Sequence, residues 1–169
     1  MKNQSLNTRK IALNGILGAL AVVCLLLATI MPTNRLSFYV LSSFFIAVAI
    51  IESGSKAGWL FYLATSLLSF IIVPDKLGLV PYVIFFGMYG LIKYYIEKLN
   101  KIVIEYVLKF VYFNICAGIA FIAVSELFGY GMTTKLPWWL LVIALEIVFF
   151  IYDFVYTLFI NYYRAKFKR

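Results

Sequence analysis

The sequence predicts an all-α integral membrane protein, a bundle of six transmembrane helices with both termini in the cytoplasm. Of its 169 residues, 64% are hydrophobic and only 13% are charged, and long apolar runs alternate with short polar breaks. The mean hydropathy is +0.98. Soluble domains are about half apolar and a quarter charged, because they need a polar surface. We therefore expect a multi-pass protein of the cell membrane, with the lipid bilayer as its solvent.

Six apolar runs are long enough for spanning helices, which need about 20 residues each. The runs are continuous, whereas the strands of a membrane barrel alternate apolar and polar residues, so helices are expected. The first run has a basic start, but at about 21 residues it is longer than the roughly 7–15 of a signal sequence, and we expect it to be retained. The expected helices, in a single domain of residues 1–169, are 11–31, 36–51, 57–73, 77–96, 102–128 and 137–163.

The distribution of Lys and Arg predicts the orientation. With the N-terminus inside, 12 of these residues fall on the cytoplasmic side and 3 outside, namely Arg35, Lys76 and Lys135. This follows the excess of positive charge in cytoplasmic loops and requires an even number of spans. It also accounts for the net charge of +8, since basic ends bind anionic headgroups. No basic soluble module is present, so no nucleic acid partner is expected.

Several residue types and motifs are missing from the sequence. There is no histidine, which excludes Ser-His hydrolysis, His-ligated haem and His-containing zinc sites. The phosphate-binding motif G-x-x-x-x-G-K-[ST] is also missing. Cys24 and Cys116 lie in apolar runs, as packing residues do. We therefore expect no enzyme activity, no metal and no cofactor, and any nucleotide-driven step must come from another chain.

Polar residues within apolar runs are costly in lipid and are candidates for function. Glu146 lies about 14 Å from the outer end of the sixth run, where the sequence offers no obvious basic partner. Asp153 follows on the same helical face, but an ion pair with Lys109 or Lys93 is the favoured interpretation. Lys93 is also spaced for a pair with Glu97.

The fifth run adds Asn114 near its middle and Glu126 near its outer end. Each has two interpretations. Asn114 either bonds across helices, as polar groups in bundles do, or contacts a ligand. Glu126 either lies at the interface or contacts a ligand.

The outer loops supply aromatic and polar residues. Asn34 and Arg35 follow the first run, while Tyr130, Trp138 and Trp139 link the last two. Aromatic residues at this level commonly form an interfacial belt, but they also stack on flat heterocycles in binding sites. Together with Glu146, Asn114 and Glu126, these residues predict a ligand cavity open to the outside.

The inner half of the first run is rich in small residues. Ala12, Gly15 and Ala19 recur at helical spacing, and small-x-x-x-small pairs let another helix approach closely. This face predicts docking of a partner protein.

Size, six runs, cytoplasmic ends and one stretch of sequence give a resemblance to a known family. The stretch is Thr8-Arg9-Lys10-Ile11-Ala12-Leu13 followed by Gly15-Ile16-Leu17-Gly18-Ala19. The chain resembles, over nearly its whole length, the substrate-binding S component of energy-coupling factor (ECF) transporters. In that family an Ala-x-x-x-Ala face docks on a transmembrane coupling protein, and Gly15 and Ala19 match its spacing with glycine replacing one alanine.

The resemblance implies capture of a vitamin or related small micronutrient near the outer face, by the loop after the first helix and the last three helices. Partner ATPases would drive release. Two alternatives stay open from the residues alone. One is a small structural or regulatory membrane protein without a transport role, and the other is a membrane enzyme or a self-sufficient channel.

Overall fold

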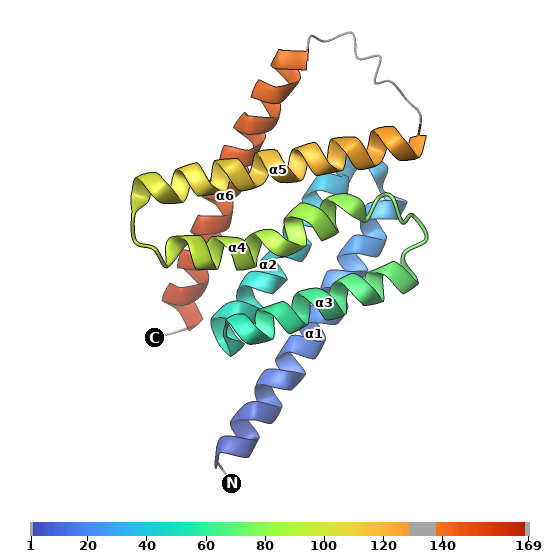
Figure 1. Ribbon diagram of the computed structural model, residues 1–169. Helices are drawn as coiled ribbons and strands as arrows, with labels where there is room; N and C mark the ends of the chain where they lie inside the picture. The colour runs from blue at the N-terminus through green and yellow to red at the C-terminus, as the bar shows by residue number, and fades with distance from the viewer. Residues whose placement is uncertain (1, 129–137, 168–169) are drawn as a thin grey trace. The chain divides into compact units, whose positions relative to one another are not determined.

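The computed structural model describes residues 2–128 and 138–167. Within these helices, the side chains of 2–7, 32, 123–128 and 138 fall outside the description. The described residues form an all-α structure with six helices (Figure 1), which confirms the predicted fold class at that level. The helices are α1 Lys2–Ile30, α2 Arg35–Ser53, α3 Ser55–Ile72, α4 Gly87–Glu97, α5 Ile102–Phe128 and α6 Trp138–Phe167.

Five of these helices are long and apolar enough to cross a membrane. Most helix ends agree with the apolar runs, and α5 agrees at both ends. At the two ends of the chain, α1 and α6 extend further into polar sequence, to Lys2 and Phe167. Hydropathy predicts the apolar part of a helix, whereas Lys, Arg and Gln also have good helix propensity. The spanning parts are Thr8–Ile30, Arg35–Ser53, Ser55–Ile72, Ile102–Ile122 and Trp139–Phe167.

The fourth predicted helix has a different construction. Residues 77–79 form a turn, in which the Leu79 N–H bonds the carbonyl of Lys76 at 3.2 Å. Helical structure begins at Val80, passes through the π-helical segment Tyr82–Phe86 and continues as α4 to Glu97. Pro81 therefore lies in the first turn, where its missing N–H needs no partner. The wider π turn interrupts the regular α-helical pattern that the sequence predicts.

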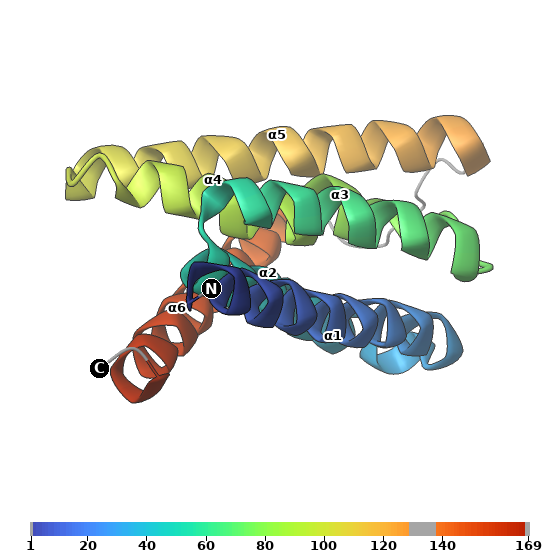
Figure 2. The same cartoon turned by 90° about the horizontal axis from the view of Figure 1, so that it is seen from below.

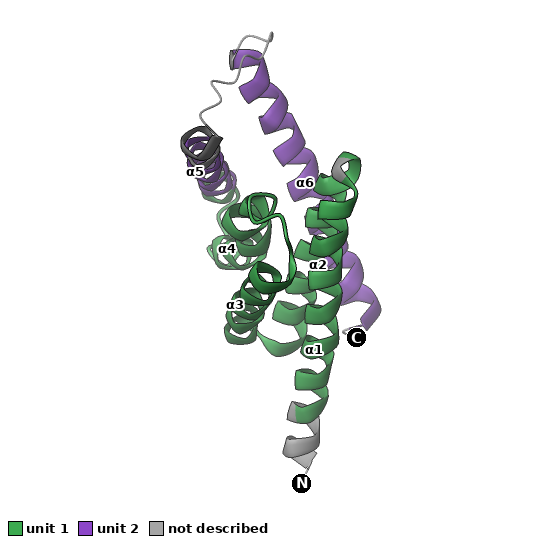
Figure 3. Cartoon of the chain, turned by 90° about the vertical axis from the view of Figure 1, so that its right-hand side faces the viewer, with its two compact units in different colours: residues 1–105 green, residues 106–169 purple. Residues whose placement is uncertain are grey.

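The chain divides into two compact units, Met1–Glu105 and Tyr106–Arg169 (Figure 3). Unit 1 contains α1 to α4, in which α1 and α2 form one layer and α3 and α4 form a second (Figures 2 and 3). Helix α2 contacts α1, α3 and α4 and is the centre of the unit. Unit 2 contains α6 and all of α5 after its first turn.

Short connections hold α2 to α3 and α4 to α5. Gly54 alone separates α2 from α3, with a left-handed φ of 90° that glycine adopts without steric cost. Asn100, with φ 53°, lies in the predicted charged turn before α5, and Asn is one of the few residues that tolerate this conformation. The helices therefore break within the expected stretches 52–56 and 97–101, but only at Gly54 in the first and at 98–101 in the second.

Gly58 allows the closest helix packing in unit 1. A Cβ atom on Gly58 would lie 2.5 Å from Ile50 Cγ1 and 3.0 Å from Leu91 Cδ2. The contact with Ile50 is closer than real Cβ atoms show and the contact with Leu91 is tight, so the absent side chain allows α3 to approach α2 and α4. Gly15 on α1 differs, since a Cβ there would meet nothing within 4 Å.

We expect Gly58→Ala to lower the stability of the purified protein, by about 1–3 kcal/mol from overpacking. Gly15→Ala is the matched control and should be neutral or slightly stabilising, because alanine has the higher helix propensity. Thermal unfolding of both variants in one detergent makes the comparison. Equal melting temperatures for the two variants would show that Gly58 does not set the packing.

Candidate binding site

Unit 2 carries three layers of side-chain contact between α5 and α6. The polar pair Asn114–Glu146 forms one end layer and the ion pair Lys109–Asp153 forms the other. Between them the rings of Phe113 and Phe149 stack with centroids 4.5 Å apart and planes inclined by 12°. On α6 the three positions are spaced by three and four residues, so they share one face of the helix.

Asn114 and Glu146, both sequence candidates, are brought together. The Asn114 Nδ2 donates to the Phe110 carbonyl at 2.9 Å and to Glu146 Oε1 at 2.8 Å. A backbone carbonyl only accepts hydrogen bonds, which determines the orientation of the amide. The second carboxyl oxygen, Glu146 Oε2, is buried and has no hydrogen-bond partner among the described residues. The partner of Glu146 is thus an amide rather than a cation.

The Lys109–Asp153 layer is an ion pair of the kind expected from the sequence. The Lys109 Nζ lies 3.3 Å from Asp153 Oδ2, and the two side chains are only 7% and 11% exposed. Thr157 donates to the backbone carbonyl of Asp153 at 2.8 Å. Breaking a buried pair from one side leaves an uncompensated charge, so this layer has a structural role. In unit 1, Lys93 pairs with Glu97 at 2.7 Å along α4.

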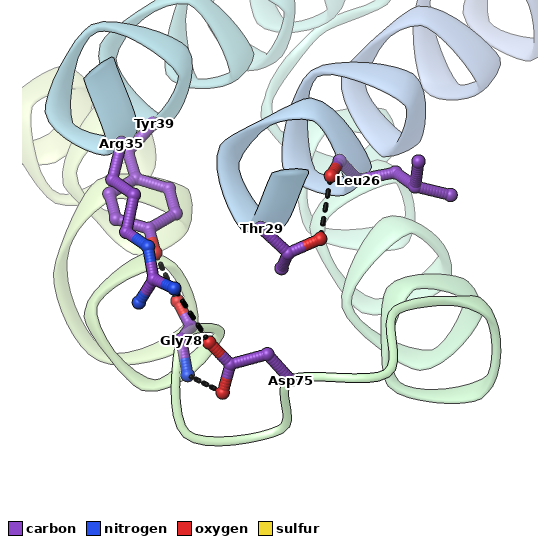
Figure 4. Close-up of polar contacts among 6 residues, drawn as sticks. All are labelled: Leu26, Thr29, Arg35, Tyr39, Asp75 and Gly78. Atoms are coloured by element: carbon purple, nitrogen blue, oxygen red, sulfur yellow. Dashed lines mark hydrogen bonds and ion pairs between the residues drawn. The ribbon is translucent and has the colours of Figure 1, made fainter. Parts of the chain in front are cut away.

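In unit 1, a network that we call the loop clasp connects the start of α2 to the loop before the π-helical segment (Figure 4). It consists of Arg35, Tyr39, Asp75 and Gly78. Asp75 Oδ2 lies 3.1 Å from Arg35 Nη2, and Asp75 Oδ1 accepts from the Gly78 N–H at 2.9 Å. The Tyr39 hydroxyl donates to the Gly78 carbonyl. Both carboxylate oxygens of Asp75 are therefore used to hold this loop.

The loop clasp changes the interpretation of Arg35. Its guanidinium is bound to Asp75, although its Nε is buried without a hydrogen-bond partner. Asn34 ends the 3₁₀ turn Pro32–Asn34 and is exposed. Thr29, on α1 in Figure 4, donates to the Leu26 carbonyl of its own helix at 2.7 Å and does not join the clasp.

Sequence reasoning missed a cluster of buried hydroxyl groups inside unit 1. Thr65 Oγ1 lies 3.1 Å from the Tyr82 hydroxyl, and Ser42 Oγ donates to the Ala21 carbonyl at 3.3 Å. Ser69, one turn from Thr65, is also fully buried. The sequence feature that could have revealed this cluster is the helical spacing of Tyr62, Thr65 and Ser69, which places them on one face of an apolar run. Such hydroxyls join helices where lipid removes the hydrophobic drive to associate.

Helix α1 has small residues on two faces with different surroundings. A Cβ on Gly18 would contact Phe61 and Thr65 at 3.7 Å, so this face packs on α3. Ala12, Gly15 and Ala19, the predicted docking residues, are exposed, and the space beside Gly15 is open.

The remaining residues that the sequence predicts for the site are only partly described by the structure. Tyr130 lies outside the described residues, and Glu126 and Trp138 lie on α5 and α6 with side chains outside the description. Trp139, in the first turn of α6, is 53% exposed. Within the described residues, no three Cys, Asp or Glu side chains gather as metal ligands.

Comparison of the chain with protein-family models, with curated proteins and with solved structures finds no match. Similarity therefore assigns no family, and the function has to be argued from the residues of this chain.

Two substitutions of Asp75 separate the contribution of its ion pair with Arg35 from that of its hydrogen bond with Gly78. Asp75→Asn keeps an oxygen for the Gly78 N–H but loses the ion pair with Arg35, whereas Asp75→Ala loses both. We expect amide hydrogen exchange in residues 74–80 to rise in both variants and about 2–10-fold more in Asp75→Ala, as one lost hydrogen bond implies. Mass spectrometry of the exchanged peptides measures this.

Thr29→Val is the control for the loop clasp, since the Thr29 hydroxyl bonds its own helix, and it should leave the exchange of residues 74–80 unchanged. Equal exchange in wild type and Asp75→Ala would contradict the account of the clasp.

Proposed function

We propose that the chain is a membrane-embedded substrate-capture subunit for uptake of a vitamin or related small micronutrient. A transmembrane coupling protein and ATPase subunits would energise it. The observation that carries this proposal is the free face of α1. Ala12, Gly15 and Ala19 are exposed, while the small residue on the next face, Gly18, packs on α3. A small-residue face without a partner in its own unit suits the close approach of another helix.

The proposal also includes six membrane-spanning segments, with both ends of the chain in the cytoplasm. Helical structure is continuous from Val80 to Glu97, and 18 helical residues extend about 27 Å, close to the bilayer core of about 30 Å. If this segment did not cross and the N-terminus stayed inside, 10 of the 15 Lys and Arg residues would lie outside. Such a distribution reverses the usual charge bias, whereas six spans place 12 inside.

The mechanism proposed is binding without chemistry. The sequence has no histidine and no phosphate-binding loop, so partner ATPases supply the energy. The Asn114–Glu146 pair provides polar contacts to the ligand at membrane depth, where polar groups mark substrate sites. Further contacts within residues 106–169 are proposed for Glu126, Tyr130, Trp138 and Trp139.

Partner docking is tested by Gly15→Leu. The leucine fits the free space of the isolated chain, because nothing lies within 4 Å of a Cβ at Gly15, but it would obstruct another helix. We expect the tagged protein, gently solubilised from its own membrane, to retain a membrane partner and ATPases. Gly15→Leu should reduce their recovery at least about tenfold, equivalent to about 1.4 kcal/mol, with an unchanged melting temperature.

Gly118→Leu is the matched control, since a Cβ at Gly118 also meets nothing within 4 Å, and it should retain the partners. Recovery of a membrane partner without ATPases would favour the structural or regulatory alternative. Equal recovery with wild type and Gly15→Leu would refute the docking assignment.

A further inference from the structure

The hydrogen bonds of the Asn114–Glu146 pair leave acceptor oxygens without donors. Both described hydrogen bonds of Asn114 come from its Nδ2, which uses both amide protons. The Asn114 side-chain oxygen accepts none in the described part of the chain. Glu146 Oε1 accepts from Asn114, and Glu146 Oε2 is buried without a partner. The pair is therefore deficient in donors.

Charge pairing also leaves the Glu146 carboxyl group without a cation in the described part of the chain. Asp75, Glu97 and Asp153 each form an ion pair with Arg35, Lys93 and Lys109 respectively. Glu146 takes part in none within residues 2–128 and 138–167. The Glu146 side chain is half-buried and its Oε2 atom is enclosed. An enclosed carboxylate oxygen needs a cation or a donor, and the Asn114 amide supplies one hydrogen bond, to Oε1.

An aromatic pair lies directly beside this carboxyl group. Phe113 precedes Asn114 in the chain, Phe149 lies one turn from Glu146 on α6, and their rings are stacked. Cations are attracted to the faces of aromatic rings, and aromatic side chains commonly line ligand sites. A planar N–H donor matches the acceptors and the apolar neighbours better than a carboxylate or a phosphate.

We propose that the ligand of the Asn114–Glu146 pair presents a planar cationic N–H donor group, such as an amidinium, a guanidinium or a protonated amino-heterocycle. The proposal rests on the proposed function, because it names the substrate class of the same site. An N–H group of the ligand donates to Glu146 Oε2, and the positive charge neutralises the carboxylate. An ammonium group of a lipid headgroup has related chemistry, so the experiment separates the two sources.

The test uses the full chain, purified in detergent without added lipid, and three probes at about 10 mM, the range in which fragments of this size bind. Benzamidinium carries a planar cation on a ring, benzoate carries an anion on the same ring, and phosphoethanolamine represents a lipid headgroup. We expect benzamidinium to raise the melting temperature by about 2–4 °C, and the other two probes to leave it unchanged.

Variants assign the effect to Glu146. Glu146→Gln replaces one carboxyl oxygen by a donor and should abolish the shift with benzamidinium. Glu146→Asp keeps the charge and should retain part of the shift, even if Glu146→Gln folds poorly. Asp153→Asn removes a carboxylate of the neighbouring ion-pair layer and should retain the whole shift.

Three results would overturn the ligand class: an equal shift with benzoate, a full shift in Glu146→Gln, or no shift with benzamidinium. A shift with phosphoethanolamine alone would assign the site to lipid and also overturn it. If any of these results occurs while the wild-type chain still retains its ATPase partners, the ligand class fails and the proposed function stands. If the partners are also missing, the proposed function fails with it.

Discussion

Five helices of this chain are long and apolar enough to cross a membrane, and polar groups in such helices have to find partners within the protein. Water cannot satisfy a carboxylate, an ammonium or a hydroxyl in the middle of a bilayer. The structure meets this constraint repeatedly. Lys109 pairs with Asp153, Lys93 pairs with Glu97, and Thr65 contacts Tyr82. Among the described residues, five buried side-chain atoms have no hydrogen-bond partner, and Glu146 Oε2 is the one carboxylate oxygen among them. This is why it directs attention to a ligand.

The same constraint determines how the helices pack. In lipid, apolar side chains gain little by leaving their solvent, so helices associate through close contact and interhelical hydrogen bonds. Gly58 provides the closest contact in unit 1, and Ser42, which donates to the Ala21 carbonyl, provides a bond between α2 and α1. Gly15 lies on a face with the same kind of residues and no contact in its own unit, which is the physical basis for proposing a partner helix there.

Hydropathy predicted five of the six helices well because each of those apolar runs corresponds to one long helix, as for α5 at Ile102–Phe128. It did not predict the start of α1 at Lys2, since helix propensity continues into polar sequence, nor the π-helical segment Tyr82–Phe86, since a wider turn leaves no signature in composition. Two of the five long apolar helices also begin with a polar residue, Arg35 in α2 and Ser55 in α3. Both residues lie just before the apolar runs that predicted these helices.

Of the candidate site, the parts controlled by charge were predictable. A buried Asp153 needs a cation, and Lys109 was one of two candidates. The contact of Asn114 with Glu146 was not predicted, because single polar residues on two helices do not indicate which of them meet. The Arg35–Asp75 pair joins the start of α2 to a loop forty residues later, and hydropathy carries no information about which segments come together.

The number of membrane crossings is the claim on which the orientation, the docking face and the ligand site all depend. Cys24 and Cys116 are buried and can be replaced by serine, so that single cysteines at Asn3→Cys, Thr33→Cys or Lys168→Cys report on the termini and the first loop. With a membrane-impermeant maleimide on intact cells, six spans predict labelling of the first loop only, and labelling of both termini after permeabilisation. Labelling of the C-terminus on intact cells while the N-terminus stays protected would mean five spans and would contradict the account.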